Sequence, residues 1–345
     1  MHLRLTALLA ATILLPVLAG CSGPTPDAAP TDTSNVTTFL GRAEDDALFA
    51  RADTPRTFRF PEDHGAHPDF RTEWWYLTGN LEAADGRHFG FQMTFFRFAI
   101  AAEPAERPSD WATGQLWMAH FAVTDTAAER FYSDEKFERE ALGLAGASTV
   151  PYRVWLADWE LAGSADERWF PLTLRADGDG FGLELEIDEG KPLVLQGEDG
   201  LDPKGPEPGN ASYYYSFTRL PARGRVRLGD TGYEVSGNVW MDREWSTSVL
   251  GPDLEGWNWF AIQLDDGYDL MYYRLREKDG GTAPWSGGIL VDPGVDLAIE
   301  PRIAEQELDL SVRYWEGAIV VRGERGGTPV TGAGYAEHAG VSARE

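Results

Sequence analysis

The fold class is decided by two neighbouring stretches, GNVWMDREW (residues 237–245) and GWNWFAIQLDDGYDLMYYRLR (residues 256–276). In the second stretch, apolar and polar residues alternate on both sides of Asp266 and Gly267. An Asp-Gly pair suits a tight turn, because glycine tolerates a positive φ angle. The pattern predicts a β-hairpin with aromatic and charged side chains on opposite faces of a sheet.

An earlier segment repeats this order. It runs from EWWYLTGNL (residues 73–81) through Asp85 and Gly86 to FGFQMTFFRF (residues 89–98). The two turns lie about 180 residues apart, a distance that favours duplication of a β unit over a short solenoid repeat. The alternative is chance similarity between two aromatic-rich hairpins.

The N-terminal region predicts export and lipid attachment. Residues 1–20 contain an apolar run that is too short for a spanning helix with normal flanks, so we interpret them as a signal peptide. Leu18-Ala19-Gly20-Cys21 resembles a bacterial lipobox, which implies cleavage before Cys21 and its acylation. We therefore expect a protein of the cell envelope, held outside the cytoplasm by a membrane anchor. Ser22 favours the outer membrane or periplasmic face if the cell is Gram-negative.

The rest of the chain is predicted to be all-β. Cys21 is the only cysteine, so no disulfide or cysteine nucleophile remains after acylation. Residues 21–54 are rich in Pro, Thr, Ala and Asp and suggest a disordered tether. We expect an N-terminal domain over 55–205 and a C-terminal domain over 206–345, with the boundary in the Pro- and Gly-rich segment 197–210. A short helix is expected over 134–141.

The formal net charge is −26, which makes nucleic acid and anionic lipid poor partners. We interpret the acidity as a source of solubility. The sequence does not indicate an oligomeric state.

Several motifs, in a fixed order, resemble the lipocalin-like family of hydroxyneurosporene synthase (carotenoid 1,2-hydratase), and more closely its secreted, AttH-like branch, whose members are often labelled predicted secreted hydrolases. These motifs are DHGAH (63–67), RTEWWYLTGNL (71–81), MAHFAVTD (118–125), YYYSFTRL (213–220) and VWMDREW (239–245). The resemblance implies two consecutive lipocalin-like (calycin) antiparallel β-barrels. It also implies an apolar, isoprenoid or polyketide-like substrate that is hydrated, isomerised or cyclised. The chain departs from the family's closing strand at residues 334–340, although Tyr335 and Glu337 remain in place.

Hydration of an isolated alkene needs a carboxylic acid that stays protonated, together with aromatic faces beside the carbocation. Asp242 and Glu244 lie two residues apart and so share one strand face, where mutual repulsion and the neighbouring tryptophans would raise one pKa. We expect one of them to act as the acid and the other to orient water, with Tyr272 as a hydroxyl donor. The alternatives are an ion pair with Arg243 and a structural role where the domains meet.

The ligand is expected to contact aromatic and histidine side chains, namely Trp74, Trp75, His67, His120, Trp245, Trp257 and Trp259. An alternative assigns His64, His67 and His120 to a zinc site completed by Glu73 or Asp125, as in a metal-assisted hydrolase. Their spacing is not a known zinc signature, so we predict no metal and no cofactor. No Gly-x-Ser-x-Gly motif occurs, so nothing indicates a serine hydrolase.

Two functions remain open from the sequence. The first is an enzyme of hydratase or isomerase type that acts on an apolar, isoprenoid or lipid-derived molecule. The second is a carrier that binds such a molecule without catalysis.

Overall fold

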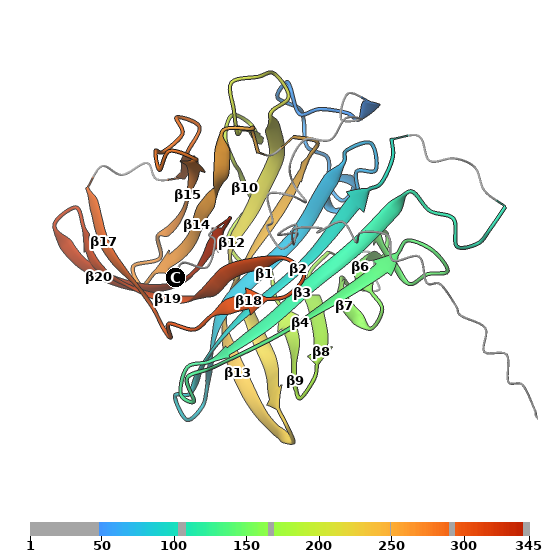
Figure 1. Cartoon of the computed structure of the whole chain (residues 1–345). Helices are drawn as coiled ribbons and strands as arrows, with labels where there is room; N and C mark the ends of the chain where they lie inside the picture. Colours follow the sequence, from blue (N-terminus) through green and yellow to red (C-terminus); the bar gives the residue numbers. More distant parts are fainter. Residues whose placement is uncertain (1–47, 103–107, 165–168, 249, 290–293, 341–345) are drawn as a thin grey trace, which may run out of the picture. The chain divides into compact units, whose positions relative to one another are not determined.

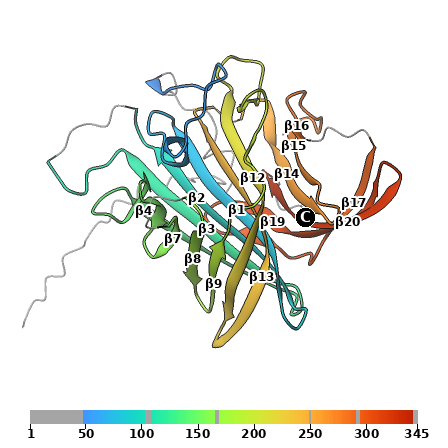
Figure 2. The same ribbon diagram turned by 180° about the vertical axis from the view of Figure 1, so that it is seen from behind.

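The chain folds into antiparallel strands that form two sheets (Figures 1 and 2). This computed structural model describes residues 48–102, 108–164, 169–248, 250–289 and 294–340, which all belong to one compact unit, Thr33–Glu345. Besides the strands it contains a short 3-10 helix, η2 (Glu62–His64). In the described part of the chain, no helix is both long enough and apolar enough to cross a membrane. The predicted signal peptide and Cys21 lie outside the described residues.

The first sheet is a nearly closed barrel. Its strands follow the order β4 (Arg130–Arg139), β3 (Gln115–Asp125), β2 (His88–Ala99), β1 (Thr72–Ala83), β13 (Thr231–Ser246), β12 (Ala211–Leu228), β9 (Phe181–Ile187), β8 (Leu172–Gly178), β7 (Trp159–Ala162), β6 (Tyr152–Leu156) and β5 (Ala145–Thr149), and β10 (Val194–Leu195) and β11 (Leu201–Pro203) pair with β12. The first strand of this order, β4, approaches the strands near its other end, since Lys136 Nζ lies 4.4 Å from the ring centroid of Trp159 on β7.

The second sheet is a half-barrel. Its strands follow the order β16 (Gly287–Ile289), β15 (Asp269–Glu277), β14 (Leu254–Leu264), β20 (Thr328–Ala339), β19 (Arg313–Arg325) and β17 (Val295–Pro301), and β18 (Glu307–Asp309) pairs with β19. The all-β prediction and the two-sheet architecture are thus confirmed, with one barrel nearly closed and the other half formed.

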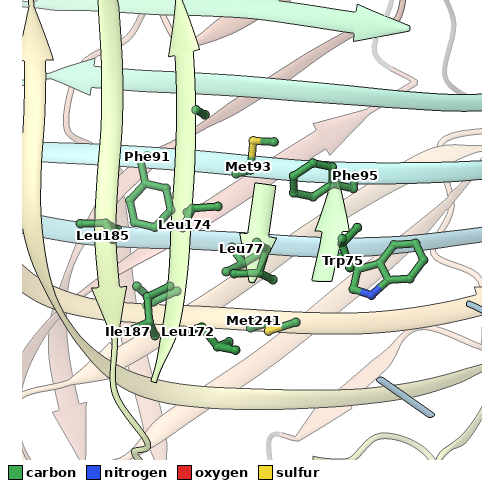
Figure 3. Packing of buried hydrophobic residues seen from close by; sticks show 14 of the residues in the cluster. Trp75, Leu77, Phe91, Met93, Phe95, Leu172, Leu174, Leu185, Ile187 and Met241 are labelled. Atoms are coloured by element: carbon green, nitrogen blue, oxygen red, sulfur yellow. The ribbon is translucent and has the colours of Figure 1, made fainter. Parts of the chain in front are cut away.

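The barrel of the first sheet is filled by its own side chains. Trp75 and Leu77 of β1, Phe91 and Met93 of β2 and Met241 of β13 are all fully buried. They belong to the same core cluster as the leucine and isoleucine side chains of β8 and β9 that Figure 3 labels. Because successive strand residues face opposite ways, Trp74, Tyr76, Asp242 and Glu244 lie on the outer face of the same strands.

That outer face packs against the second sheet. Asn80 of β1 donates a hydrogen bond to the Gly334 carbonyl of β20 (3.0 Å), and Arg219 of β12 binds Asp269 of β15 (2.6 Å). A Cβ atom on Gly90 of β2 would lie only 2.6 Å from the Cβ of Ala318 on β19. The sheets therefore touch closely beside the cavity described below.

The two predicted hairpins, β1–β2 and β14–β15, have the same turn. Gly86 (φ 83°) and Gly267 (φ 86°) occupy the left-handed region, and each follows an Asp whose side chain accepts a hydrogen bond from the backbone N–H two residues later (3.0 Å in both). Each loop has three residues, and only its glycine has a positive φ. This geometry corresponds to a type I turn followed by a bulge, not to the two-residue turn that an Asp-Gly pair most often forms.

The sequence predicts a domain boundary after residue 205. In the structure, β12 and β13 belong to the first sheet, and the chain reaches the second sheet between Ser246 and Leu254. The Pro- and Gly-rich segment 197–210 forms turns around β11 inside the first sheet. The helix expected over 134–141 is wrong, because these residues continue β4 and its following bend, where pairing with β3 outweighs helical periodicity.

Candidate functional site

A cavity of about 90 Å³ lies between the two sheets. Strands β1, β2, β3, β12 and β13 supply one wall, and β14, β15, β19 and β20 supply the other. The lining residues are Trp74, Tyr76, Thr94, Phe96, Phe98, Met118, His120, Lys204, Tyr214, Asp242, Glu244, Trp257, Trp259, Tyr273, Leu275, Val312, Tyr314, Glu316 and Glu337.

Aromatic rings cover much of both walls. Trp259 of β14 packs edge-on against Tyr76 of β1, with ring centroids 5.1 Å apart, and against Trp240 of β13 at 6.3 Å. Its Nε1 donates a hydrogen bond to the Tyr214 hydroxyl (3.2 Å). Such faces suit an apolar or cationic guest, because the ring quadrupole attracts positive charge.

Asp242 is the best-connected carboxyl group of the cavity. Its side chain accepts hydrogen bonds from the Ser216 hydroxyl (2.5 Å), the Tyr214 hydroxyl (2.6 Å) and the Trp240 indole N–H (2.7 Å). Burial raises the pKa of Asp242 to about 7, although these three donors oppose the rise. Asp242 can therefore exchange a proton near neutral pH.

Glu244 lies on the same strand face and has a different environment. Lys204 Nζ lies 3.6 Å from Glu244 Oε1 and 2.6 Å from Asp202, and Tyr273 donates a hydrogen bond to Asp202 (2.9 Å). Burial raises the pKa of Glu244, and Lys204 works against that rise. Burial alone would lower the pKa of Lys204, but Asp202 and Glu244 raise it, so this side chain stays protonated.

A second carboxyl pair lies on the half-barrel wall. Glu316 of β19 and Glu337 of β20 are direct cross-strand partners. The Tyr76 hydroxyl donates a short hydrogen bond to Glu316 Oε1, while Glu316 Oε2 has no hydrogen-bond partner among the described residues. Burial raises the pKa of both groups, and the charge of Glu337 raises that of Glu316 further.

His120 of β3 lies at the edge of these walls. Its Nδ1 lies 2.8 Å from the Tyr314 hydroxyl, and its Nε2, 3.7 Å from Glu135, has no hydrogen-bond partner in the described part of the chain. Burial lowers the pKa of His120 to about 3, so the ring is neutral. It can serve as a hydrogen-bonding group of the cavity but not as a cation.

The structure brings together six of the predicted site residues. Asp242, Glu244, Trp74, His120, Trp257 and Trp259 all line the cavity. Tyr272 does not, because its side chain is 38% exposed and strand alternation places the next residue, Tyr273, in the cavity instead.

Three other predicted residues lie on the barrel side of the first sheet. Trp75 and Trp245 are fully buried in its core, since they are neighbours of cavity-facing residues on β1 and β13. His67 stacks on Trp245, with ring centroids 3.8 Å apart, and binds Glu73 (2.7 Å).

The three histidines of the alternative zinc site do not gather. His64 stacks on Trp169 and bonds Tyr215 (2.7 Å), His67 lies between Asp63 and Glu73, and His120 lines the cavity. Asp125 pairs with Arg87. Among the described residues, no group of three or more His, Cys, Asp or Glu side chains is arranged to hold a metal ion.

The predicted site residues do not include the charged groups Lys204, Glu316 and Glu337 of the cavity, nor several of its hydroxyl groups, among them Tyr214. A signal for two of them was present. Glu337 retains its place in the closing-strand pattern, and Glu316 stands in the aromatic-rich RYWEG segment, residues 313–317. An acidic residue at a buried position of such a strand is unusual and indicates a functional site.

The family profile described as AttH-like matches residues 51–294. The chain belongs to the AttH-like family. A solved AttH-type protein from Nitrosomonas europaea is 34% identical, with a TM-score of 0.71, over 85% of this chain and 100% of that one. A search of curated proteins found no match.

Two more distant structures share the fold of this AttH-like protein. Kievitone hydratase from Nectria haematococca has a TM-score of 0.57 and 10% identity, over 84% of this chain and 95% of that one. CghA, solved with Sch210972, has a TM-score of 0.50 and 14% identity, over 87% of this chain and 98% of that one.

Proposed function

We propose that this AttH-like protein binds an apolar, isoprenoid or lipid-derived molecule in the cavity between its two sheets and hydrates or isomerises a carbon–carbon double bond of that molecule. The observation that carries the proposal is Asp242, a buried carboxyl group with a pKa of about 7 at an aromatic wall. Protonation of an alkene at carbon needs such an acid, together with faces that stabilise positive charge.

In the proposed reaction, the O–H bond of protonated Asp242 breaks and its proton forms a C–H bond with one alkene carbon. The other carbon becomes a carbocation beside the rings of Trp259 and Trp257. In hydration, water adds to that carbon and its surplus proton returns to Asp242, so the net change is addition of one water molecule. In isomerisation, no water adds; the Asp242 carboxylate instead takes a proton from a carbon next to the carbocation, and that C–H electron pair forms the double bond at its new position.

Glu244 is suited to orient the water. Its Oε1 is buried without a hydrogen-bond partner among the described residues, and Lys204 fixes the side chain from 3.6 Å. The shared fold with kievitone hydratase gives further support for a hydration reaction, although at 10% identity it concerns the fold alone.

Isotope exchange tests the proposal with neutral isoprenoid alcohols, farnesol and geranylgeraniol, as probes. The full chain in D₂O is expected to place deuterium on carbon of the probe, measured by mass spectrometry. Asp242→Asn should lose this exchange and bind the probe with unchanged affinity. Asp309→Asn is the matched control, because the Asp309 side chain is 85% exposed on the half-barrel.

A different outcome identifies the alternative function. If the unaltered protein binds the probes but transfers no deuterium, the protein is a carrier and the catalytic part of the proposal fails. If neither probe binds, the proposed ligand class is wrong as well.

We also propose that the protein is held in the cell envelope by acyl chains on Cys21, because Leu18-Ala19-Gly20-Cys21 resembles a lipobox. Membrane fractions should contain the unaltered protein, and Cys21→Ala should release it. Retention of Cys21→Ala in the membrane fraction would contradict the anchor.

A further inference from the structure

The cavity offers no free positive charge to a ligand. Of the described residues that line it, only Lys204 carries a cationic side chain at neutral pH. Its Nζ is held by Asp202 (2.6 Å) and Glu244 (3.6 Å), and it lies 3.9 Å from the ring centroid of Tyr273. A ligand carboxylate or phosphate would therefore be buried near acidic groups without a counter-charge, which is unfavourable.

The cavity does offer acceptors with unfilled hydrogen bonds. Glu316 Oε2 and Glu244 Oε1 are buried and have no hydrogen-bond partner among the described residues, although Glu244 Oε1 faces Lys204 Nζ at 3.6 Å. Glu316 has no exposed surface, lines the cavity, and lies opposite Glu337 on the next strand. A donor from a ligand would complete the bonding of Glu316 and would relieve the repulsion within the carboxyl pair.

Aromatic faces surround these acceptors. Tyr76 bonds Glu316, Trp259 pairs with Glu337 across β14 and β20, and Trp257 is a neighbour of Trp259 on the same strand face. Aromatic rings beside buried carboxyl groups form a favourable site for an ammonium group, which gains both cation–π attraction and charged hydrogen bonds.

We infer that the cavity selects apolar molecules that carry a protonated amine, whose ammonium group binds between Glu316 and the aromatic wall, and that it excludes molecules with a carboxylate or phosphate group. The inference rests on the proposed function in that it concerns the same cavity, and it adds the charge class of the ligand. An ammonium group would also mimic the carbocation of the proposed reaction, so such a ligand should compete with an alkene.

Three probes of equal chain length test the inference, namely octylamine, octan-1-ol and octanoate, titrated into the full chain by calorimetry at pH 7.5. Octylamine should bind at least tenfold more tightly than octan-1-ol, and octanoate should bind more weakly than either. Glu316→Gln should remove the tenfold preference of the cavity for octylamine over octan-1-ol. Glu300→Gln is the matched control, since Glu300 lies on β17 of the same sheet with a 64% exposed side chain.

Each other outcome overturns the inference. If octan-1-ol binds as tightly as octylamine, the cavity is selective for neutral ligands, and the proposed function stands while this inference fails. If octanoate binds as tightly as octylamine, the charge argument is wrong. If none of the three binds and the isoprenoid probes do not bind either, both proposals are wrong. Glu337→Gln provides a second variant should Glu316→Gln not fold, and the comparison of the three probes on the unaltered protein needs no variant.

Discussion

Glu316 and Glu337 face each other directly across β19 and β20 at the wall of the cavity, where Glu316 is fully buried and Glu337 is half-buried. Two carboxylates in such a position cannot both be charged at low cost, so at least one holds its proton at neutral pH. The Tyr76 hydroxyl bonds Glu316, while Glu337 lies on the strand that pairs with Trp259. An acid pair of this kind lowers the stability of the fold, so its presence at the cavity wall points to a functional role.

The stability of the protein should therefore fall as the pH rises through the neutral range. Burial raises the pKa of Glu337 from 4.5 to about 8 and that of Asp242 from 3.8 to about 7. At a pH between the unfolded and the folded pKa of each group, the folded protein holds a proton that the unfolded chain has released. Unfolding therefore becomes easier as the pH increases. Each group contributes a slope of up to about 1.4 kcal/mol per pH unit.

Glu337→Gln should flatten this slope, because the amide does not ionise. Relative to the unaltered protein, the variant should gain stability between pH 5 and pH 8, measured as the urea midpoint at several pH values. Glu300→Gln, a partly exposed change in the same sheet, should keep the original slope. Identical pH profiles for the Glu337 variant and the unaltered protein would show that Glu337 is not protonated in the folded state.

Tyr214→Phe should raise the pKa of Asp242 still further. The Tyr214 hydroxyl donates a 2.6 Å hydrogen bond to Asp242 and favours its charged form, so its loss should move the midpoint of protonation upward by about one pH unit. Infrared titration of the protonated carboxyl band, assigned by its absence in Asp242→Asn, measures this midpoint. Tyr273→Phe is the matched control, because the Tyr273 hydroxyl bonds Asp202 instead. An unmoved midpoint in Tyr214→Phe would remove Tyr214 from the control of this acid.

Strand alternation predicted part of the site correctly. It placed Asp242 and Glu244 on one face, and both line the cavity. It could not say which face of a strand meets the second sheet, because that depends on how the two sheets pack. For this reason the sequence favours Tyr272 where the structure has Tyr273 at the cavity, and it does not separate Trp75 from Trp74.

The sequence does not predict which distant segments contact each other. In the first sheet, β1 pairs with β13, although about 150 residues separate them in the chain. A prediction of two consecutive barrels does not include this pairing. Glu316 and Glu337 become a pair only when β19 and β20 meet in their register. Lys204 reaches the cavity from a segment that the composition marks only as a loop.

The predicted duplication can be tested through its two turns. Gly86→Ala and Gly267→Ala should each destabilise the protein by about 1 kcal/mol, because alanine is strained at φ 83° and 86°, while nothing lies within 4 Å of either added Cβ. Gly287→Ala is a suitable control, since its φ lies outside the left-handed region and its nearest neighbour, the Tyr273 hydroxyl, is 3.7 Å away. Urea midpoints that drop for one turn but not for the other would show that the two hairpins are not equivalent.

Glu73 should prove structural rather than catalytic. Its carboxylate binds Arg243 (2.6 Å), Arg97 (2.8 Å) and His67 (2.7 Å) inside the first sheet, and it does not line the cavity. Although burial opposes the effect, these neighbours lower the pKa of Glu73, so its contribution to stability is present above about pH 4.5 and is lost as the pH falls below that value.

Glu73→Gln leaves two buried guanidinium groups without a counter-charge and should cost about 3–5 kcal/mol in the free energy of unfolding near pH 7. The measurement is the urea midpoint, with Glu184→Gln as the control because its side chain is 62% exposed and pairs only at the surface with Arg175. Ligand affinity of the variant that remains folded should match that of the unaltered protein, since the Glu73 cluster and the cavity lie on opposite faces of β1. A variant with normal stability and lost ligand binding would reverse this assignment and connect the cluster to the cavity.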